Sequence, residues 1–174
     1  MLEVVTIVGN PKAASRTRTA AEHVADALAT AVAGESRSTV IELAEVADSL
    51  FDRAATAVDA LVDRVVAADI IVVASPTYKA TYTGLLKAFL DRVPAPALLG
   101  TIAVPVMVGA GAAHALAVET HLRPVLVELG ALVPTPGLYL LEEDLPLEAG
   151  RLESWLRAVL PVVRAVTGAT NQPG

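Results

Sequence analysis

The run IIVVA at residues 70–74 decides the fold of this 174-residue chain. Its five apolar residues, four of them β-branched, follow one another without a polar interruption, and the run ends at Ser75 and Pro76. A strand that is apolar on both faces is typical of the centre of a parallel sheet, because helices cover both sides of such a sheet. We therefore expect a central strand here, which ends in a loop.

The sequence on both sides of this run alternates between Val- and Ile-rich stretches and stretches with helical periodicity. The predicted strands are residues 2–8, 39–43, 70–74, 101–108 and 138–141. The predicted helices are residues 17–33, 54–68, 83–92, 113–129 and 147–166. This alternation implies β-α-β crossovers. It predicts an α/β, flavodoxin-like, doubly wound five-stranded parallel sheet of order 2-1-3-4-5, with helices on both faces.

Length and composition set the limits of function. We expect one domain over residues 1–167 and a flexible tail at 168–174. No run reaches the roughly 18 apolar residues of a membrane span. The apolar start lacks the basic region and cleavage site of a signal peptide, which predicts a cytoplasmic protein without a membrane partner. A net charge of −6 disfavours nucleic acid as a partner.

The chain has no cysteine and three histidines. The lack of cysteine excludes disulfides, thiolate catalysis, Cys-ligated zinc and iron–sulfur clusters. The histidines have no zinc-binding spacing, so we expect no metal site. A redox activity would therefore need a bound organic cofactor.

In the predicted topology a ligand lies beyond the carboxyl ends of the strands, at the loops after the first, third and fourth strands. The first loop, GNPKAASRTR at residues 9–18, precedes a helix whose first amides favour an anion. It combines small polar donors with cations: Asn10, Ser15 and Thr17 with Lys12, Arg16 and Arg18. This predicts a phosphate site. The alternative is that the hydroxyls only cap the helix and the cations are solvated.

The second loop, SPTYKATYTG at residues 75–84, holds two of the three tyrosines. Tyr78 suits the wall of a flat heterocycle, whereas Tyr82 either contacts the ligand or packs at the start of the next helix. The third loop, GAGAAH at residues 109–114, has two glycines whose amides could approach a ring edge. His114 either contacts the ligand or caps the helix.

Together, the segments GNPKAASRTR, ASPTYKATYTGLLKAFLDRVP and VMVGAGAAHALAVETHLRPVLVELGA resemble the three signature regions of the NADPH-dependent FMN reductase family. The resemblance runs from Val4 to about Gly137. It points in particular to the branch that serves two-component flavin monooxygenases, such as alkanesulfonate monooxygenase. In relatives of this branch an aromatic residue often stands in a bulged turn of the fourth helix, where this chain has Thr120.

The resemblance implies that FMN binds at the three loops. The positions that it assigns to the phosphate are Asn10, Ser15, Arg16 and Thr17. The positions that it assigns to the isoalloxazine ring are Pro76, Thr77, Tyr78 and Lys79, with Gly109, Gly111 and His114 at the pyrimidine side. It gives no side chain a catalytic role, because the flavin carries the chemistry.

The expected activity is therefore hydride transfer from NADPH or NADH to FMN. The resemblance further implies a homodimer or homotetramer and a flavin-dependent monooxygenase that receives reduced FMN. Two alternatives stay open: a flavodoxin-type electron carrier, and an FMN-containing quinone, azo or metal-ion reductase.

Overall fold

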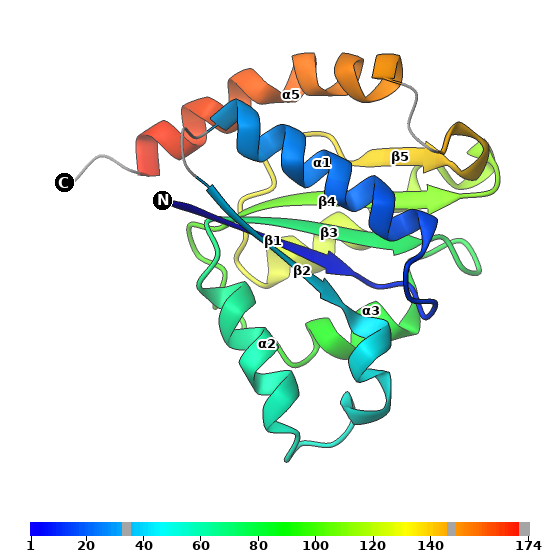
Figure 1. Cartoon of the computed structure of the whole chain (residues 1–174), viewed down its shortest axis with the longest axis vertical. Coiled ribbons are helices and arrows are strands. Elements are labelled where there is room, and N and C mark those ends of the chain that lie inside the picture. Colours follow the sequence, from blue (N-terminus) through cyan, green and yellow to red (C-terminus); the bar gives the residue numbers. More distant parts are fainter. Residues whose placement is uncertain (33–35, 146–148, 171–174) are drawn as a thin grey trace.

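A computed structural model describes residues 1–32, 36–145 and 149–170 and contains a parallel sheet with helices on both faces (Figure 1). The strand order is β2-β1-β3-β4-β5, as predicted. The strands are β1 (Leu2–Val8), β2 (Ser36–Glu42), β3 (Ile70–Pro76), β4 (Ile102–Gly109) and β5 (Leu138–Leu141). Strand β3, the run that decided the fold, lies at the centre and is buried along its whole length.

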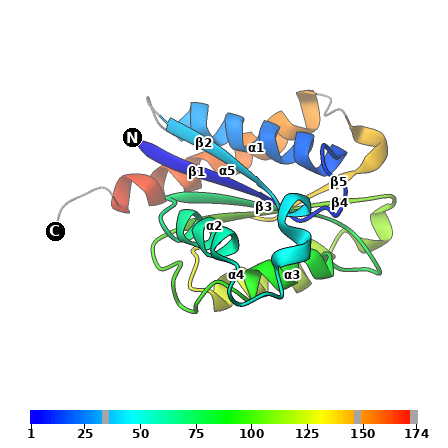
Figure 2. The same ribbon diagram turned by 60° about the horizontal axis from the view of Figure 1, so that its bottom comes forward.

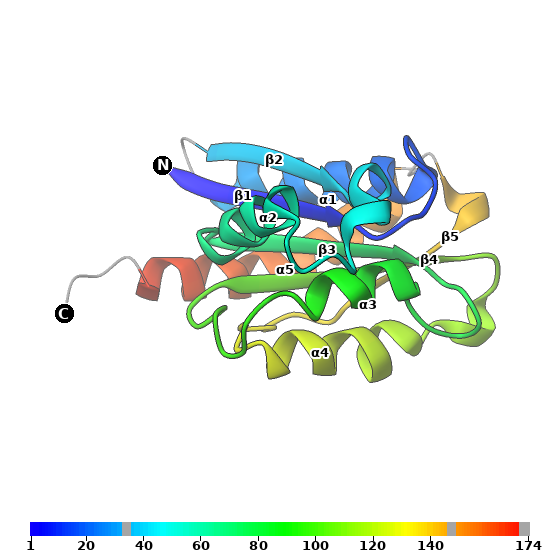
Figure 3. The ribbon, with the colours of Figure 1, turned by 90° about the horizontal axis from the view of Figure 1, so that it is seen from below.

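Helices pack against the two faces of the sheet in separate layers. The α-helices are α1 (Arg16–Val32), α2 (Thr56–Val66), α3 (Gly84–Leu90), α4 (Arg123–Glu128) and α5 (Ala149–Thr170). Helices α1 and α5 cover one face, whereas α2, α3 and α4 lie on the other, with a 3₁₀ helix at Leu43–Ser49 (Figures 2 and 3). Alternate strand residues supply the two cores: Ile71 and Val73 face α2 and α3, and Val72 and Ala74 face α1.

Apart from the fourth helix, two element boundaries differ from the prediction by three residues or more. Strand β2 begins at Ser36, not at 39, because its polar first residues pair with β1 at the edge of the sheet. Helix α5 continues through Thr170, so the expected tail overlaps a helix at 168–170. Residues 147–148, where this helix was expected to begin, and residues 171–174 lie outside the described residues.

The continuous helix predicted over 113–129 is wrong. The structure has a short 3₁₀ helix (Ala112–His114), one turn of π-helix (Val118–Leu122) and then α4. In the π turn the Arg123 amide donates to the Val118 carbonyl, five residues back. Pro124, at the start of α4, has no amide for the carbonyl four residues before it, which favours the wider turn. Thr120 lies in this π turn.

The π turn is tied to the segment before β5. The Arg123 guanidinium pairs with Glu119 and donates to the Val133 and Thr135 carbonyls, and Glu119 accepts from the Gly137 amide. The hydrogen bond from Arg123, with help from the Gly137 amide, lowers the pKa of Glu119 below its ordinary value.

Candidate functional site

The loops that follow β1 and β3 lie at the carboxyl edge of the sheet (Figure 1), and a hydrogen bond from Thr83 to Gly9 joins them. The Thr83 hydroxyl donates to the Gly9 carbonyl at 2.5 Å, and the Thr83 amide donates to Ser75 Oγ at 3.0 Å. A side chain at Gly9 would meet Leu86 Cβ at 2.6 Å, so only glycine lets the first loop lie this close to α3. The two loops therefore form one continuous edge.

The first loop borders a cavity of about 270 Å³. Among the residues that line it are Asn10, Lys12, Ser15, Arg16, Thr17, Pro76 and Tyr78. Within the loop, the Asn10 side chain donates to Thr17 Oγ1 at 3.1 Å, and Ser15 Oγ accepts from the Arg18 amide at 3.3 Å. The four positions expected to contact a phosphate thus lie together at the start of α1.

Glu42, at the end of β2, was missed from the sequence. Its side chain is 5% exposed and accepts from the Ala14 amide at 2.9 Å and from Arg18 at 2.6 Å. Ala14 has a φ of 50°, which few residues other than glycine adopt. The Arg18 guanidinium donates hydrogen bonds to Glu22 and Glu42, and these bonds raise the pKa of Arg18 above its ordinary value. Arg18 and Glu42 thus fix the shape of the first loop.

Glu142 was also missed, although it lines the same cavity. Its carboxylate accepts from Arg16 at 2.7 Å, and its carbonyl lies 3.4 Å from the same guanidinium. The two residues are 126 positions apart, so no local pattern could have paired them. The cationic cavity therefore contains a carboxylate.

A second cavity, of about 550 Å³, lies on the other side of the second loop. It is lined by Thr77, Lys79, Ala80, Ala110, Gly111, Ala113, His114 and Tyr139. Lys79 and Ala80 have φ values of 51° and 67°, because the chain reverses between two hydrogen bonds that join Tyr78 and Thr81. This tight turn presents Tyr78 to the first cavity and Lys79 to the second.

The tyrosines of the second loop have different surroundings. Tyr78 is 51% exposed, and Tyr82 packs against the core on the α2 and α3 face, which confirms the packing alternative for Tyr82. The Thr77 hydroxyl oxygen is shielded from solvent and has no hydrogen-bond partner in the described part of the chain.

The third loop is shaped by Tyr139 of β5, a residue that no local sequence pattern pointed to. Its hydroxyl donates to the Gly111 carbonyl at 2.9 Å. A side chain at Gly109 would lie 1.9 Å from that hydroxyl oxygen, whereas at Gly111 it would meet nothing within 4 Å. Gly109 is therefore required by the packing of Tyr139, and Gly111 stands at an open rim. His114 is exposed beside this rim.

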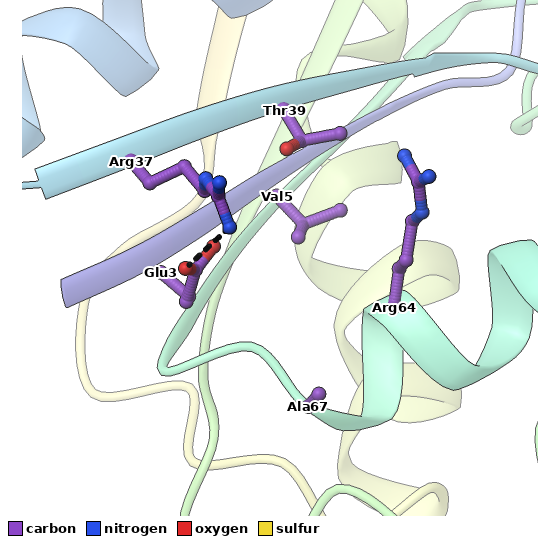
Figure 4. A pocket seen from close by; sticks show the side chains of 6 residues that line it. All are labelled: Glu3, Val5, Arg37, Thr39, Arg64 and Ala67. Carbon is purple, nitrogen blue, oxygen red and sulfur yellow. Dashed lines mark ion pairs between the residues drawn. The ribbon is translucent and has the colours of Figure 1, made fainter. Parts of the chain in front are cut away.

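A third cavity, of about 560 Å³, lies near the first residues of β1 and β2 (Figure 4). Arg37 and Arg64 reach into it, and Arg37 pairs with Glu3 at 3.6 Å. Strand and helix side chains line this hollow, so it lacks the helix N-terminus and loop amides of the carboxyl edge.

Within residues 1–32, 36–145 and 149–170, no cluster of three or more His, Asp or Glu side chains could hold a metal ion. The helices in those ranges are all too short or too polar to cross a membrane.

Comparison with known proteins places this geometry in a family. The family model described as NADPH-dependent FMN reductase matches residues 2–145. The FMN reductase (NADPH) of Escherichia coli K12 is 34% identical over 131 residues, which are 75% of this chain and 68% of that protein. The FMN reductase (NADPH) of Pseudomonas aeruginosa is 31% identical over 147 residues, which are 82% of this chain and 78% of that protein.

A solved structure agrees with the sequence matches. The apo form of an NADH:FMN oxidoreductase (EMOB) superposes with a TM-score of 0.83 and 32% identity. The superposition covers 95% of this chain and 89% of the other. The fold, the arrangement of the loops and these similarities lead to one conclusion: the chain belongs to the NADPH-dependent FMN reductase family.

Proposed function

We propose that this protein is an NAD(P)H-dependent FMN reductase whose residues 1–167 form the flavin-binding domain. The observation that carries the proposal is the pair of cavities at the carboxyl edge of the sheet. One is polar and cationic, the other has an open glycine rim, and the segment from Pro76 to Lys79 contributes to the walls of both. A ligand with an anionic tail and a flat ring fits this division.

The residues present fit FMN at both ends. At the first cavity, the start of α1 and the side chains of Asn10, Ser15, Arg16 and Thr17 would hold the phosphate. At the second cavity, the shielded Thr77 hydroxyl would gain a partner from a polar ring atom.

The ring would also contact Lys79, Gly111 and His114, which line the second cavity, and Pro76 and Tyr78, which line the first. Gly109 lines neither cavity, and we propose that its backbone borders the pyrimidine side of the ring next to Gly111. When bound, FMN supplies the redox chemistry by accepting a hydride from the nicotinamide. The chain's own residues would bind the flavin and orient its ring toward the nicotinamide. No side chain is assigned proton transfer.

The test is NADPH and NADH oxidation followed at 340 nm with FMN and, separately, with riboflavin, which lacks the phosphate. We expect turnover with FMN and a higher KM for riboflavin. If neither nucleotide is consumed faster than in a protein-free control, the reductase proposal fails and a flavodoxin-type carrier becomes the better description. Sustained quinone or azo reduction without free flavin would instead indicate a reductase with fixed FMN.

We also propose a cytoplasmic location, self-association into a dimer or tetramer, and transfer of reduced FMN to a flavin-dependent monooxygenase. Leu116 and Val127 support self-association, because they are 73% and 55% exposed on the segment that contains the π turn. Light scattering coupled to size-exclusion chromatography would measure the number of chains. A monomer at micromolar concentration would contradict this part of the proposal.

A further inference from the structure

We infer that Glu142 is a competing anion inside the phosphate cavity, which weakens FMN binding and keeps the flavin exchangeable. The inference rests on the proposed function and adds a determinant of affinity at the same site. Glu142 follows β5 directly and reaches a cavity whose other lining residues come from the first and second loops and from Val108 of β4.

Glu142 occupies the Arg16 guanidinium. The two terminal nitrogens of this guanidinium both face Glu142, one toward the carboxylate at 2.7 Å and the other toward the carbonyl at 3.4 Å. Lys12 and Arg16 both line the cavity, and Arg16 is the first residue of α1. A phosphate that uses the Arg16 guanidinium must therefore displace Glu142 or share the guanidinium with it.

The proposed ligand brings negative charge into this cavity. A phosphate monoester carries a charge of about −1.5 to −2 at pH 7. A carboxylate on the same cavity wall repels this phosphate. Because solvent screens partly exposed charges, we expect the repulsion to change the binding free energy by a modest amount. The Arg16 and Glu142 side chains are 61% and 42% exposed, so both can move without disturbing the core.

Glu42, the other carboxylate at this loop, has different surroundings from Glu142. Glu42 is 5% exposed and satisfied by Ala14 and Arg18, so it shapes the loop from behind. Glu142 faces the cavity itself. Of these two acids, only Glu142 competes with a bound phosphate.

The test is a calorimetric titration of FMN and of riboflavin into the wild type and into Glu142→Gln. We expect Glu142→Gln to lower the Kd for FMN by about threefold to tenfold, equivalent to about 0.7–1.4 kcal/mol, and to change the Kd for riboflavin by less than twofold. Glu142→Ala should shift FMN binding in the same direction. Weaker FMN binding in both variants would show that Glu142 orients Arg16 for the phosphate, and unchanged binding would show no role. Either result would overturn the inference.

The matched control is Glu143→Gln, which removes the same charge from the next residue. Glu143 is exposed and does not line the cavity, so its change should leave the FMN affinity within twofold of the wild type. An equal gain in Glu143→Gln would mean that net charge, not the position of Glu142, sets the affinity, and would overturn the inference.

A double-mutant cycle with Arg16→Ala tests the mechanism of competition. The gain from Glu142→Gln should shrink when Arg16 is absent, because no guanidinium is left to release. Equal gains in both backgrounds would contradict competition for Arg16.

These titrations need no nicotinamide, so they separate the inference from the proposed reductase activity. Tighter FMN binding in Glu142→Gln without NADPH or NADH consumption by the wild type would uphold the inference and refute the activity. If the wild type consumed NADPH or NADH but Glu142→Gln left the FMN affinity unchanged, the activity would be upheld and the inference refuted.

Discussion

The two ends of the candidate site differ in how far the protein satisfies its own polar groups. At the phosphate end, the side chains of Asn10, Ser15 and Arg16 already have partners within the chain. At the ring end, the shielded Thr77 hydroxyl has none within the described residues. The charged end is therefore held in shape by bonds that a ligand must share or replace, whereas the ring end offers an unused hydrogen-bonding group. Substitutions at the phosphate end should therefore change the affinity for FMN more than the affinity for riboflavin. Substitutions at the ring end should change the two affinities equally.

The largest effect should come from the third loop, where two glycines have different surroundings. Gly109→Ala would place a Cβ 1.9 Å from the Tyr139 hydroxyl oxygen, so we expect a loss of about 3 kcal/mol in the free energy of unfolding. Gly111→Ala is the control, because its Cβ would meet nothing within 4 Å and its φ of −157° suits any residue. Urea unfolding measures both, and equal losses would contradict this account of the rim.

The second effect concerns the buried carboxylate behind the first loop. Glu42→Ala removes the acceptor of the Ala14 amide and a partner of Arg18, so the loop loses contacts that hold its shape. We expect the Kd for FMN to rise by about tenfold or more, and the Kd for riboflavin by much less. Fluorescence titration measures both values. An equal rise for the two ligands would show that Glu42 supports the whole site and not the phosphate end.

The third effect concerns the shielded Thr77 hydroxyl at the ring end of the site. Thr77→Val replaces a hydroxyl that has no partner among the described residues with a methyl group of similar size, so the ligand-free protein should be as stable as the wild type or slightly more stable. Binding of FMN and riboflavin should weaken equally, by about threefold to tenfold. If only FMN binding weakened, Thr77 would belong to the phosphate end.

The smallest effect should come from the Glu119–Arg123 pair, which lies outside both cavities. Because its folded-state pKa is lowered, Glu119 adds stability above its ordinary pKa of about 4.5 and loses that contribution as the pH falls through the lowered value. Glu119→Gln should cost about 0.5–1 kcal/mol at pH 7 and less near pH 3.

Glu128→Gln, an exposed change on α4, is the control for the Glu119 experiment. It should cost nothing at either pH in the same urea unfolding assay. A cost for Glu119→Gln that grows toward low pH would contradict the direction assigned to its pKa.

The strand order and the position of the site could be predicted from the sequence, because they follow from local patterns. The run at residues 70–74 fixes the central strand, and each loop is recognised from the residues beside it. The partners of the loop residues could not be predicted in this way. Ala14 and Glu42 are 28 residues apart, and Arg16 and Glu142 are 126 apart.

The failure at the fourth helix has a different cause. Helical periodicity over 113–129 was correct for the buried residues Val118, Leu122 and Leu126. The pattern of apolar residues does not distinguish a π turn from an α turn. Pro124 was the available signal that the hydrogen bonding changes there.

A crystal structure of the protein with FMN would test the position of the flavin site most directly. We predict the phosphate beside Ser15 and Thr17 at the start of α1, with the ring between Thr77 and Gly111. A flavin bound between Arg37 and Arg64 in the hollow of Figure 4, or one with its ring in the first cavity, would contradict this prediction.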